Sequence, residues 1–178
     1  MRLLVAHASK HGATAGIAAR IAEKLTASGH DVTVRPVTDA GDPAGFGAVI
    51  VGSATYMGHW LKDAKAYIRE HQESLATRPV WLFSSGPIGE AKVDKEGKDL
   101  REATAPQELP KLLASVHPRE HRVFFGALDP KHLTLPERAL RKLPASRELF
   151  PEGDFRDWED IDAWAAHVAA ELEQHNPL

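Results

Sequence analysis

The 178-residue sequence contains no cysteine, and this absence excludes several kinds of chemistry at once. A chain without thiols forms no disulfides, has no cysteine nucleophile and holds neither an iron–sulfur cluster nor a cofactor through cysteine. The lack of disulfides also fits a reducing compartment. We therefore expect a cytoplasmic protein.

Long apolar runs and an excess of basic charge are also lacking. No stretch approaches the roughly 20 apolar residues of a membrane-spanning helix, and the apolar run near the amino terminus is too short for the core of a signal peptide. The formal net charge is -3, and lysine and arginine are spread along the chain without forming the basic patch that nucleic-acid binding needs. We expect no transmembrane segment and no nucleic-acid partner, and peripheral contact with a membrane stays open.

What the sequence does contain is an alternation of two patterns. Short apolar runs predict buried strands, and the segments between them carry apolar residues at helical spacing. The predicted strands are residues 2–8, 31–37, 48–53, 80–84 and 121–128, and the predicted helices are residues 13–28, 60–75, 106–116 and a last one that begins at Asp157. This order predicts a single α/β domain over residues 1–178, with an open five-stranded parallel sheet and helices on both faces.

Two segments interrupt the alternation. Residues 85–104 contain glycine and interleaved charges of both signs, which indicates a long solvated loop with at most a helical turn. Residues 129–154 are irregular and rich in proline, so they form an insertion after or within the fifth strand. Inside this insertion, residues 134–137 read T-L-P-E, a capping box with proline in the first turn, and predict a short helix carrying Leu140 and Leu143.

The loop after the first strand has the properties of an anion site. It reads S-K-H-G-A-T over residues 9–14, and a helix starts immediately afterwards. The free N–H groups and the dipole of a helix start attract anions, Gly12 lets the backbone approach a ligand closely, and Ser9 and Thr14 add hydroxyls. The simpler interpretation, in which Thr14 caps the helix and Gly12 makes a turn, stays open.

Two more loops lie at the same predicted edge, where ligands bind in open parallel sheets. The segment after the third strand reads S-A-T-Y-M-G-H-W over residues 53–60, and its aromatic and sulfur-bearing side chains suit stacking on a planar ring. The segment after the fourth strand, S-S-G-P-I-G over residues 84–89, offers hydroxyls and backbone groups to the edge of such a ring. The alternative is that the aromatic residues only cover a helix end.

At these residues the sequence resembles a known family. The S-K-H-G-A-T loop is similar to the flavodoxin phosphate loop, S/T-x-S/T-G-x-T, with His11 in place of the middle hydroxyl. The segments V-I-V-G-S-A-T-Y-M-G-H-W, F-F-G-A-L-D and D-W-E resemble the flavodoxin-like branch that contains the menaquinone-dependent protoporphyrinogen oxidases. The similarity runs over nearly the whole chain.

The resemblance implies an FMN-binding flavoprotein oxidoreductase, in which the flavin supplies the redox chemistry. No catalytic side chain and no metal ligand is expected. The residues implied to hold the phosphate are Ser9, Lys10, His11, Gly12, Ala13 and Thr14. Those implied to flank the flavin ring are Ala54, Thr55, Tyr56, Met57 and Gly58 from the second loop and Ser84, Ser85, Gly86, Pro87 and Gly89 from the third. The resemblance does not decide whether Tyr56 or Met57 faces the ring.

The resemblance also implies an electron partner, which is a quinone, a porphyrinogen or a redox partner protein. The insertion of residues 129–154 places its leucines beside Arg138, Arg141 and Lys142, and we predict that it contacts this partner. The competing interpretation, in which both leucines pack inward and the insertion only shields the edge of the sheet, stays open. Two alternatives stay open. One is an electron carrier without a substrate of its own, and the other is a flavin-free binding module of the same fold, which the His11 substitution leaves possible.

The charges of the predicted site favour a negatively charged reduced flavin. The loops carry Lys10, His11 and His59 and contain no acidic residue before Glu90. Because acidic neighbours disfavour negative charge on a reduced ring, this pattern suits a quinone-linked oxidase more than a low-potential carrier.

Overall fold

The main sheet has five parallel strands in the order β2-β1-β3-β5-β6. A computed structural model describes residues 1–140, 142–143 and 151–174 of the chain. The strands are β1 (Arg2–Ala8), β2 (Asp31–Pro36), β3 (Ala48–Tyr56), β5 (Val80–Ser85) and β6 (Glu120–Phe124), and the two-residue strand β4 (His59–Trp60) pairs antiparallel with the end of β3. The predicted open, five-stranded parallel sheet is confirmed.

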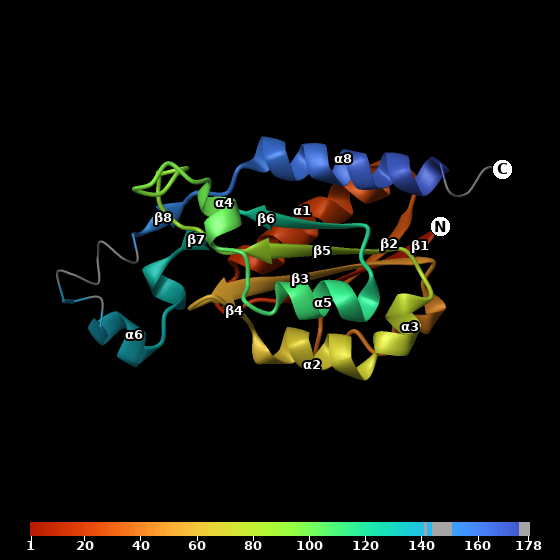
Figure 1. Ribbon diagram of the computed structural model, residues 1–178, viewed down its shortest axis with the longest axis horizontal. Coiled ribbons are helices and arrows are strands. Elements are labelled where there is room, and N and C mark those ends of the chain that lie inside the picture. The colour runs from red at the N-terminus through yellow and green to blue at the C-terminus, as the bar shows by residue number, and fades with distance from the viewer. Residues whose placement is uncertain (141, 144–150, 175–178) are drawn as a thin grey trace.

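Helices cover both faces of this sheet (Figure 1). Helices α1 (Ala13–Ala27) and α8 (Trp158–Gln174) lie on one face, and α2 (Lys62–Glu70), α3 (Gln72–Ala76) and α5 (Leu109–Val116) lie on the other. Two separate apolar clusters result, because side chains of successive strand residues point to opposite faces. Leu3 and Val5 of β1 pack toward α1 and α8, whereas Leu4 and Ala6 pack toward α2 and α5.

Most predicted elements agree with the structure, but the helix predicted for residues 60–75 starts later than expected and is divided in two. Trp60 is part of β4, and the helical segment is broken into α2 and α3 at His71. Trp60 joins the sheet because it pairs with Thr55 and buries its indole, whose Nε1 donates to Ser84 Oγ at 2.7 Å. A tertiary contact therefore overrides the helical spacing of this segment.

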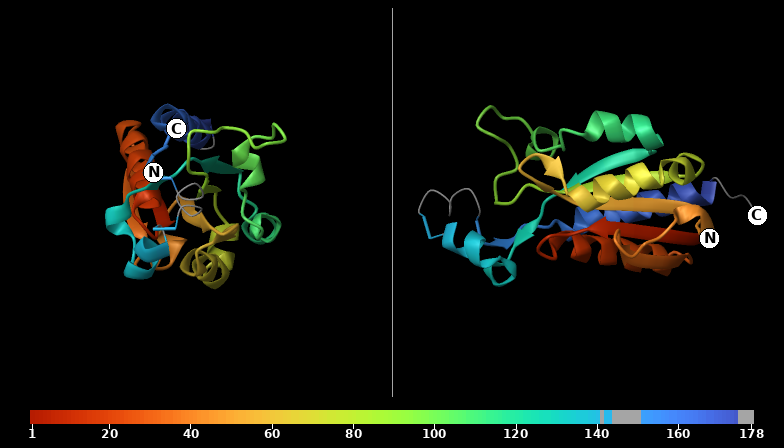
Figure 2. Two further views of the ribbon diagram at one scale, coloured as in Figure 1. Left: turned by 90° about the vertical axis from the view of Figure 1, so that its left-hand side faces the viewer. Right: turned by 90° about the horizontal axis from the view of Figure 1, so that it is seen from below.

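The fifth strand also ends earlier than predicted. The chain leaves the main sheet after Phe124, and β7 (Ala127–Leu128) pairs antiparallel with β8 (Gly153–Asp154). Between them lie a 3₁₀ turn (Pro130–His132) and the predicted capped helix, α6 (Leu135–Leu140), which extend beyond the carboxyl end of the sheet (Figure 2). Arg141 and residues 144–150 of the insertion lie outside the described residues.

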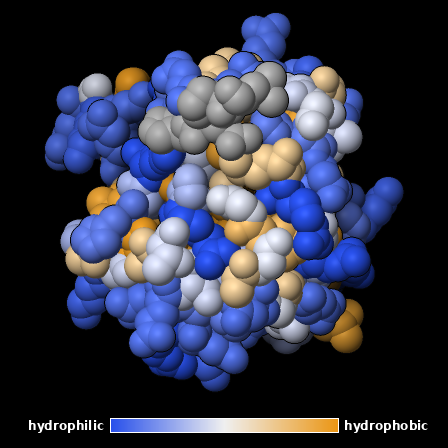
Figure 3. Space-filling view, turned by 90° about the vertical axis from the view of Figure 1, so that its right-hand side faces the viewer, coloured by the Kyte–Doolittle hydropathy of each residue, from blue (hydrophilic) through white to orange (hydrophobic). Residues whose placement is uncertain are grey.

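The two ends of the sheet carry different parts of the chain. The end with the amino termini of the strands shows a largely hydrophilic surface in Figure 3. The opposite end carries the loops singled out by the sequence, together with α6 and the β7–β8 hairpin. In the described part of the chain, no helix combines the length and apolar character needed to span a membrane.

Candidate functional site

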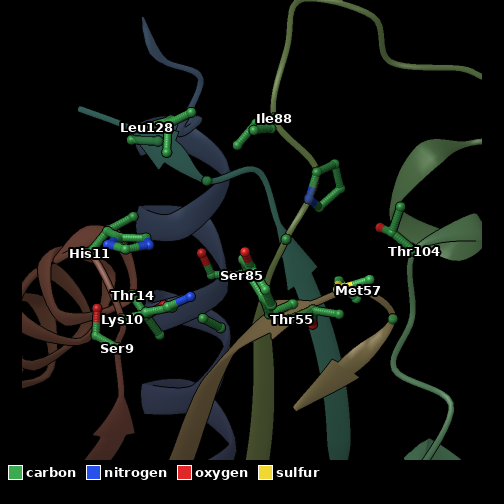
Figure 4. Close-up of a pocket in the computed structure, with 18 of the residues that line it drawn as sticks. Ser9, Lys10, His11, Thr14, Thr55, Met57, Ser85, Ile88, Thr104 and Leu128 are labelled. Carbon is green, nitrogen blue, oxygen red and sulfur yellow. The ribbon is translucent and has the colours of Figure 1, made fainter. Parts of the chain in front are cut away.

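The carboxyl ends of β1, β3 and β5 open into a cleft of about 720 Å³. The loops that follow these strands surround it, with Ser9 and Thr14 on one side and Met57 on the other (Figure 4). The predicted residues that line it are Ser9, Lys10, His11, Ala13, Thr14, Ala54, Thr55, Tyr56, Met57, Gly58, Ser85, Gly86 and Pro87. The structure does not bring Gly12, Ser84 and Gly89 into this lining, and Gly12 lines a neighbouring hollow instead.

The loop of residues 9–14 is shaped to present backbone N–H groups to the cleft. Gly12 caps α1 with φ 89° and ψ -19°, and no side chain caps this helix start. Gly12 N donates to Ser9 Oγ at 3.1 Å, which folds the loop back on itself. The first turn of α1 contains no acidic residue. An anion at Ala13 and Thr14 would therefore meet unpaired helix N–H groups and the positive end of the helix dipole.

Lys10 and His11 tie this loop to the insertion. The Lys10 ammonium donates to Oε1 of Glu137 at 2.5 Å and lies 4.0 Å from the centre of the Tyr56 ring. His11 Nδ1 lies 3.0 Å from the carbonyl oxygen of His132. The loops themselves contain no acidic residue before Glu90, as the sequence indicates, but the insertion folds the Glu137 carboxylate back onto Lys10.

The second loop is a tight hairpin turn between β3 and β4. Tyr56 pairs with His59, and the two residues between them, Met57 and Gly58, have φ values of 50° and 79°. Two positive φ angles are the signature of a type I′ turn, which matches the twist of a hairpin. Gln107 N donates to the Gly58 carbonyl at 2.9 Å, so the turn is held against the wall of the cleft. Met57 is 82% exposed at its tip.

A second carboxylate holds the base of this hairpin. Glu108 Oε1 accepts from Lys65 Nζ at 2.7 Å and lies 2.8 Å from His59 Nδ1, and its Oε2 accepts from Trp60 N at 3.4 Å. Burial opposes the ionisation of Glu108, but hydrogen bonds from Lys65, the backbone and His59 lower its pKa to about 2. His59 is thus paired with an acid, as Lys10 is.

The third loop makes the floor of the cleft. Ser85 is 5% exposed and lines the cleft, and a Cβ on Gly86 would lie 3.3 Å from Thr55 Cβ. Among the described residues, the buried Oγ1 of Thr55 has no hydrogen-bond partner. A buried hydroxyl without a partner carries a desolvation cost that a bound polar group would remove. Thr55 therefore points to a ligand with a hydrogen-bonding edge.

Two parts of the cleft were missed in the sequence. Helix α4 (Leu100–Ala103), a single turn of the kind that the sequence allowed, forms one wall together with the residues after it, where the sequence suggested only a solvated loop. Asp99 caps α4 by accepting from Arg101 N at 2.8 Å, and this cap was the signal available in the sequence. Gly126 and strand β7 form the other missed part, because the fifth strand was predicted to continue through residue 128.

Ser84 lies beneath the cleft in a buried hydrogen-bonded group. Its Oγ accepts from Trp60 Nε1 at 2.7 Å and lies 2.8 Å from His121 Nε2. Since burial lowers the pKa of His121 to about 4, its ring is neutral at pH 7, and its tautomer decides whether Ser84 Oγ donates to Nε2 or accepts from it. Ser84 therefore joins β4 and β6 to β5 under the site.

Lowering the pH from 7 to 4 should destabilise the protein by about 3 kcal/mol through His121. Its pKa is about 4 in the folded chain against an ordinary value of 6.5. The unfolded chain therefore takes up a proton that the folded chain does not, so this contribution is complete above pH 6.5 and is lost as the pH falls through 4. Urea unfolding at several pH values measures the free energy.

His121→Gln is the matched variant for this prediction, because its side-chain amide can still form a hydrogen bond with Ser84. Its free energy of unfolding should fall less steeply between pH 6.5 and 4. The free energy of unfolding of the variant still depends on pH, since burial also lowers the pKa of His7 and His30. An identical slope in the wild type and in the variant would contradict the role of His121.

Comparisons with known proteins agree with this architecture. The family described as flavodoxin domain matches residues 4–147. A flavodoxin from the domain Archaea has a TM-score of 0.61 at 16% identity, over 97% of this chain and 99% of that one. Flavodoxin 2 from Bacillus cereus has a TM-score of 0.60 at 22% identity, over 97% and 99%. Curated protein sequences include no significant match.

A larger protein contains the same fold as one part. Rubredoxin oxygen:oxidoreductase from the anaerobe Desulfovibrio gigas aligns with a TM-score of 0.60 at 14% identity, over 97% of this chain and 36% of that one. At such low identity, these structures establish the fold alone. The chemistry has to be argued from the residues of the site.

Proposed function

Because the chain belongs to the flavodoxin domain family, we propose that it binds FMN in the cleft and transfers electrons through it. One observation carries this proposal. The uncapped start of α1 lies at the same cleft of about 720 Å³ as Thr55, whose buried Oγ1 has no hydrogen-bond partner among the described residues. The first suits a phosphate and the second a hydrogen-bonding ring, so the residues present fit the cofactor.

At the phosphate end, the chain supplies donors on rigid elements. The N–H groups of Ala13 and Thr14 belong to the first turn of α1, and Ser9 and Lys10 border the same part of the cleft. Thr14 is 1% exposed, so its position is fixed by packing. These groups would bind and orient the phosphate.

At the ring end, the hairpin turn and the third loop would enclose the flavin, which supplies the redox chemistry when bound. The Lys10 ammonium already occupies one face of Tyr56, 4.0 Å from the ring centre. Met57 is 82% exposed beside the cleft. We therefore assign the contact with the flavin ring to Met57.

The first test is a calorimetric titration of apoprotein with FMN. The wild type should bind, and Thr55→Val should bind roughly 5- to 10-fold more weakly, because a hydrogen bond contributes about 1 kcal/mol. Thr33→Val makes the same change in β2, outside the residues that line the cleft, and should leave FMN affinity unchanged.

If the wild type binds no FMN, the proposal fails and the flavin-free binding module gains support. Equal FMN affinities for Thr55→Val and the wild type would place the ligand elsewhere in the cleft.

Electron transfer to a redox partner protein is the simpler form of this function. A quinone-linked oxidoreductase is the second form of this function. It is favoured by the apolar residues that line the cleft, which are Leu100, Ala103, Ile88 and Leu128. Lys10 is the sole lysine or arginine among the described lining residues, and it is paired with Glu137. A neutral quinone therefore suits the cleft better than a porphyrinogen with several carboxylates. Saturable reoxidation of the reduced protein by a quinone would distinguish the enzyme from the carrier.

A further inference from the structure

Two contacts of one carboxylate join the insertion to the phosphate loop. Oε1 of Glu137 accepts from Lys10 Nζ at 2.5 Å and lies 3.5 Å from His11 Nε2. Glu137 follows Lys10 by 127 residues along the chain. The two basic side chains that follow Ser9 therefore face the same acidic group, which α6 supplies.

Glu137 is held firmly in this place as an anion. Its second oxygen, Oε2, accepts from the backbone N and from Oγ1 of Thr134, each at 2.9 Å, and its side chain is 18% exposed. Burial opposes ionisation, but the hydrogen bonds from Lys10 and Thr134 lower the pKa of Glu137 to about 2. The carboxylate is therefore charged at neutral pH.

The two ring nitrogens of His11 differ in their contacts: Nδ1 faces a carbonyl oxygen and Nε2 faces Glu137. Nδ1 lies 3.0 Å from the His132 carbonyl oxygen, and a carbonyl can only accept, so Nδ1 carries a hydrogen. Nε2 then bears a second hydrogen only in the charged ring. The cleft side of the loop thus contains the cation Lys10 and the imidazole of His11, and the insertion contacts both.

We infer that Glu137 is a specificity-determining residue that competes with a bound phosphate for Lys10 and His11. This inference rests on the proposed FMN function. A phosphate dianion at the loop would lie close to the Glu137 carboxylate, and two anions beside the same cation, Lys10, repel each other. Glu137 therefore weakens the binding of flavins that carry a phosphate and leaves riboflavin, which has none, unaffected.

The competition also links the occupancy of the loop to the position of α6. In the described structure, Glu137 connects α6 to Lys10 and His11. When phosphate takes over these two partners, α6 loses this attachment. Coupling between two sites is reciprocal. The attachment of α6 through Glu137 therefore weakens the binding of FMN by the same factor by which bound FMN weakens that attachment.

The test compares FMN and riboflavin titrations of the wild type and Glu137→Gln. Glutamine keeps an oxygen that can accept from Thr134, so α6 stays capped while the charge is removed. FMN affinity should rise roughly tenfold, within the usual range of coupling energies, and riboflavin affinity should stay within about twofold. Raising the salt concentration should reduce the gain for FMN.

Glu73→Gln is the charge-matched control. Glu73 is exposed on α3, which lies at the opposite end of the molecule from α6 (Figure 1). This variant changes the net charge equally and should bind FMN like the wild type. An equal gain in both variants would attribute the effect to net charge and overturn the inference.

The outcomes separate the inference from the proposed function. If the wild type binds FMN but Glu137→Gln binds it equally or more weakly, the inference fails and the function stands. If no flavin binds to the wild type, the proposed function fails, and titration with inorganic phosphate still decides the inference. Tighter phosphate binding by Glu137→Gln supports it, and unchanged binding overturns it.

The absence of cysteine allows a direct measurement of α6. Nitroxide labels on Leu140→Cys in α6 and Arg69→Cys in α2 give a distance distribution by pulsed electron paramagnetic resonance. Both positions are exposed. FMN should broaden this distribution and riboflavin should not. An unchanged distribution with FMN bound would show that α6 keeps its attachment and would overturn the competition.

Discussion

Gly12→Val should weaken FMN binding by roughly 5- to 150-fold, the factor that corresponds to about 1–3 kcal/mol of backbone strain. Gly12 has φ 89° at the start of α1, a conformation that a β-branched residue strongly disfavours. The variant loop would relax to another conformation and would have to be forced back when phosphate binds. Calorimetry with apoprotein measures the change.

Gly29→Val is the matched control for this prediction. Gly29 has φ 88° beyond the other end of α1, and no atom lies within 4 Å of a Cβ placed there. It therefore introduces a similar backbone strain at a distance from the cleft. The two variants should lose similar stability, and only Gly12→Val should lose FMN affinity. Similar FMN affinities in both variants would remove the loop of residues 9–14 from the binding site.

Much of the sheet could be predicted because its signals are local. The apolar run of β1 gives both of its ends correctly, and β3 and β5 continue only slightly beyond their predicted ends. The end of β6 could not be predicted in this way. F-F-G-A-L reads as one apolar run, yet Ala127 pairs with Asp154 in a separate hairpin. The distant partner decides where that strand stops.

In the candidate site, too, the features set by local sequence could be predicted, and those set by distant contacts could not. The loop of residues 9–14 and the hairpin turn are each one continuous stretch of sequence, so their residue types predict a shared edge. Glu137 could be predicted as part of a capping box, which the bond from Thr134 N confirms. The contact of Glu137 with Lys10 could not be predicted, because this contact depends on how the insertion folds back over the loop of residues 9–14. Charge inferred from loops alone therefore misses the acids that the fold adds.

Gly52→Ala should destabilise the fold by roughly 3 kcal/mol or more, as expected for severe overpacking. Gly52 of β3 pairs with Phe83 of β5, and a Cβ on Gly52 would lie 1.9 Å from Phe83 Cζ. The Phe83 ring has little room to move, because the Phe124 and Trp164 rings lie 6.0 and 6.3 Å from its centre. Urea unfolding followed by circular dichroism measures the loss.

The cause of this loss can be isolated by adding Phe83→Leu to Gly52→Ala. Phe83 is 0% exposed, so Phe83→Leu alone should cost about 1–2 kcal/mol through lost packing. The smaller side chain gives the new methyl group space, so the double variant should be more stable than Gly52→Ala alone. Such non-additivity is expected only for residues in contact. If the two losses simply add, the clash with the ring is not what makes glycine necessary in this central strand.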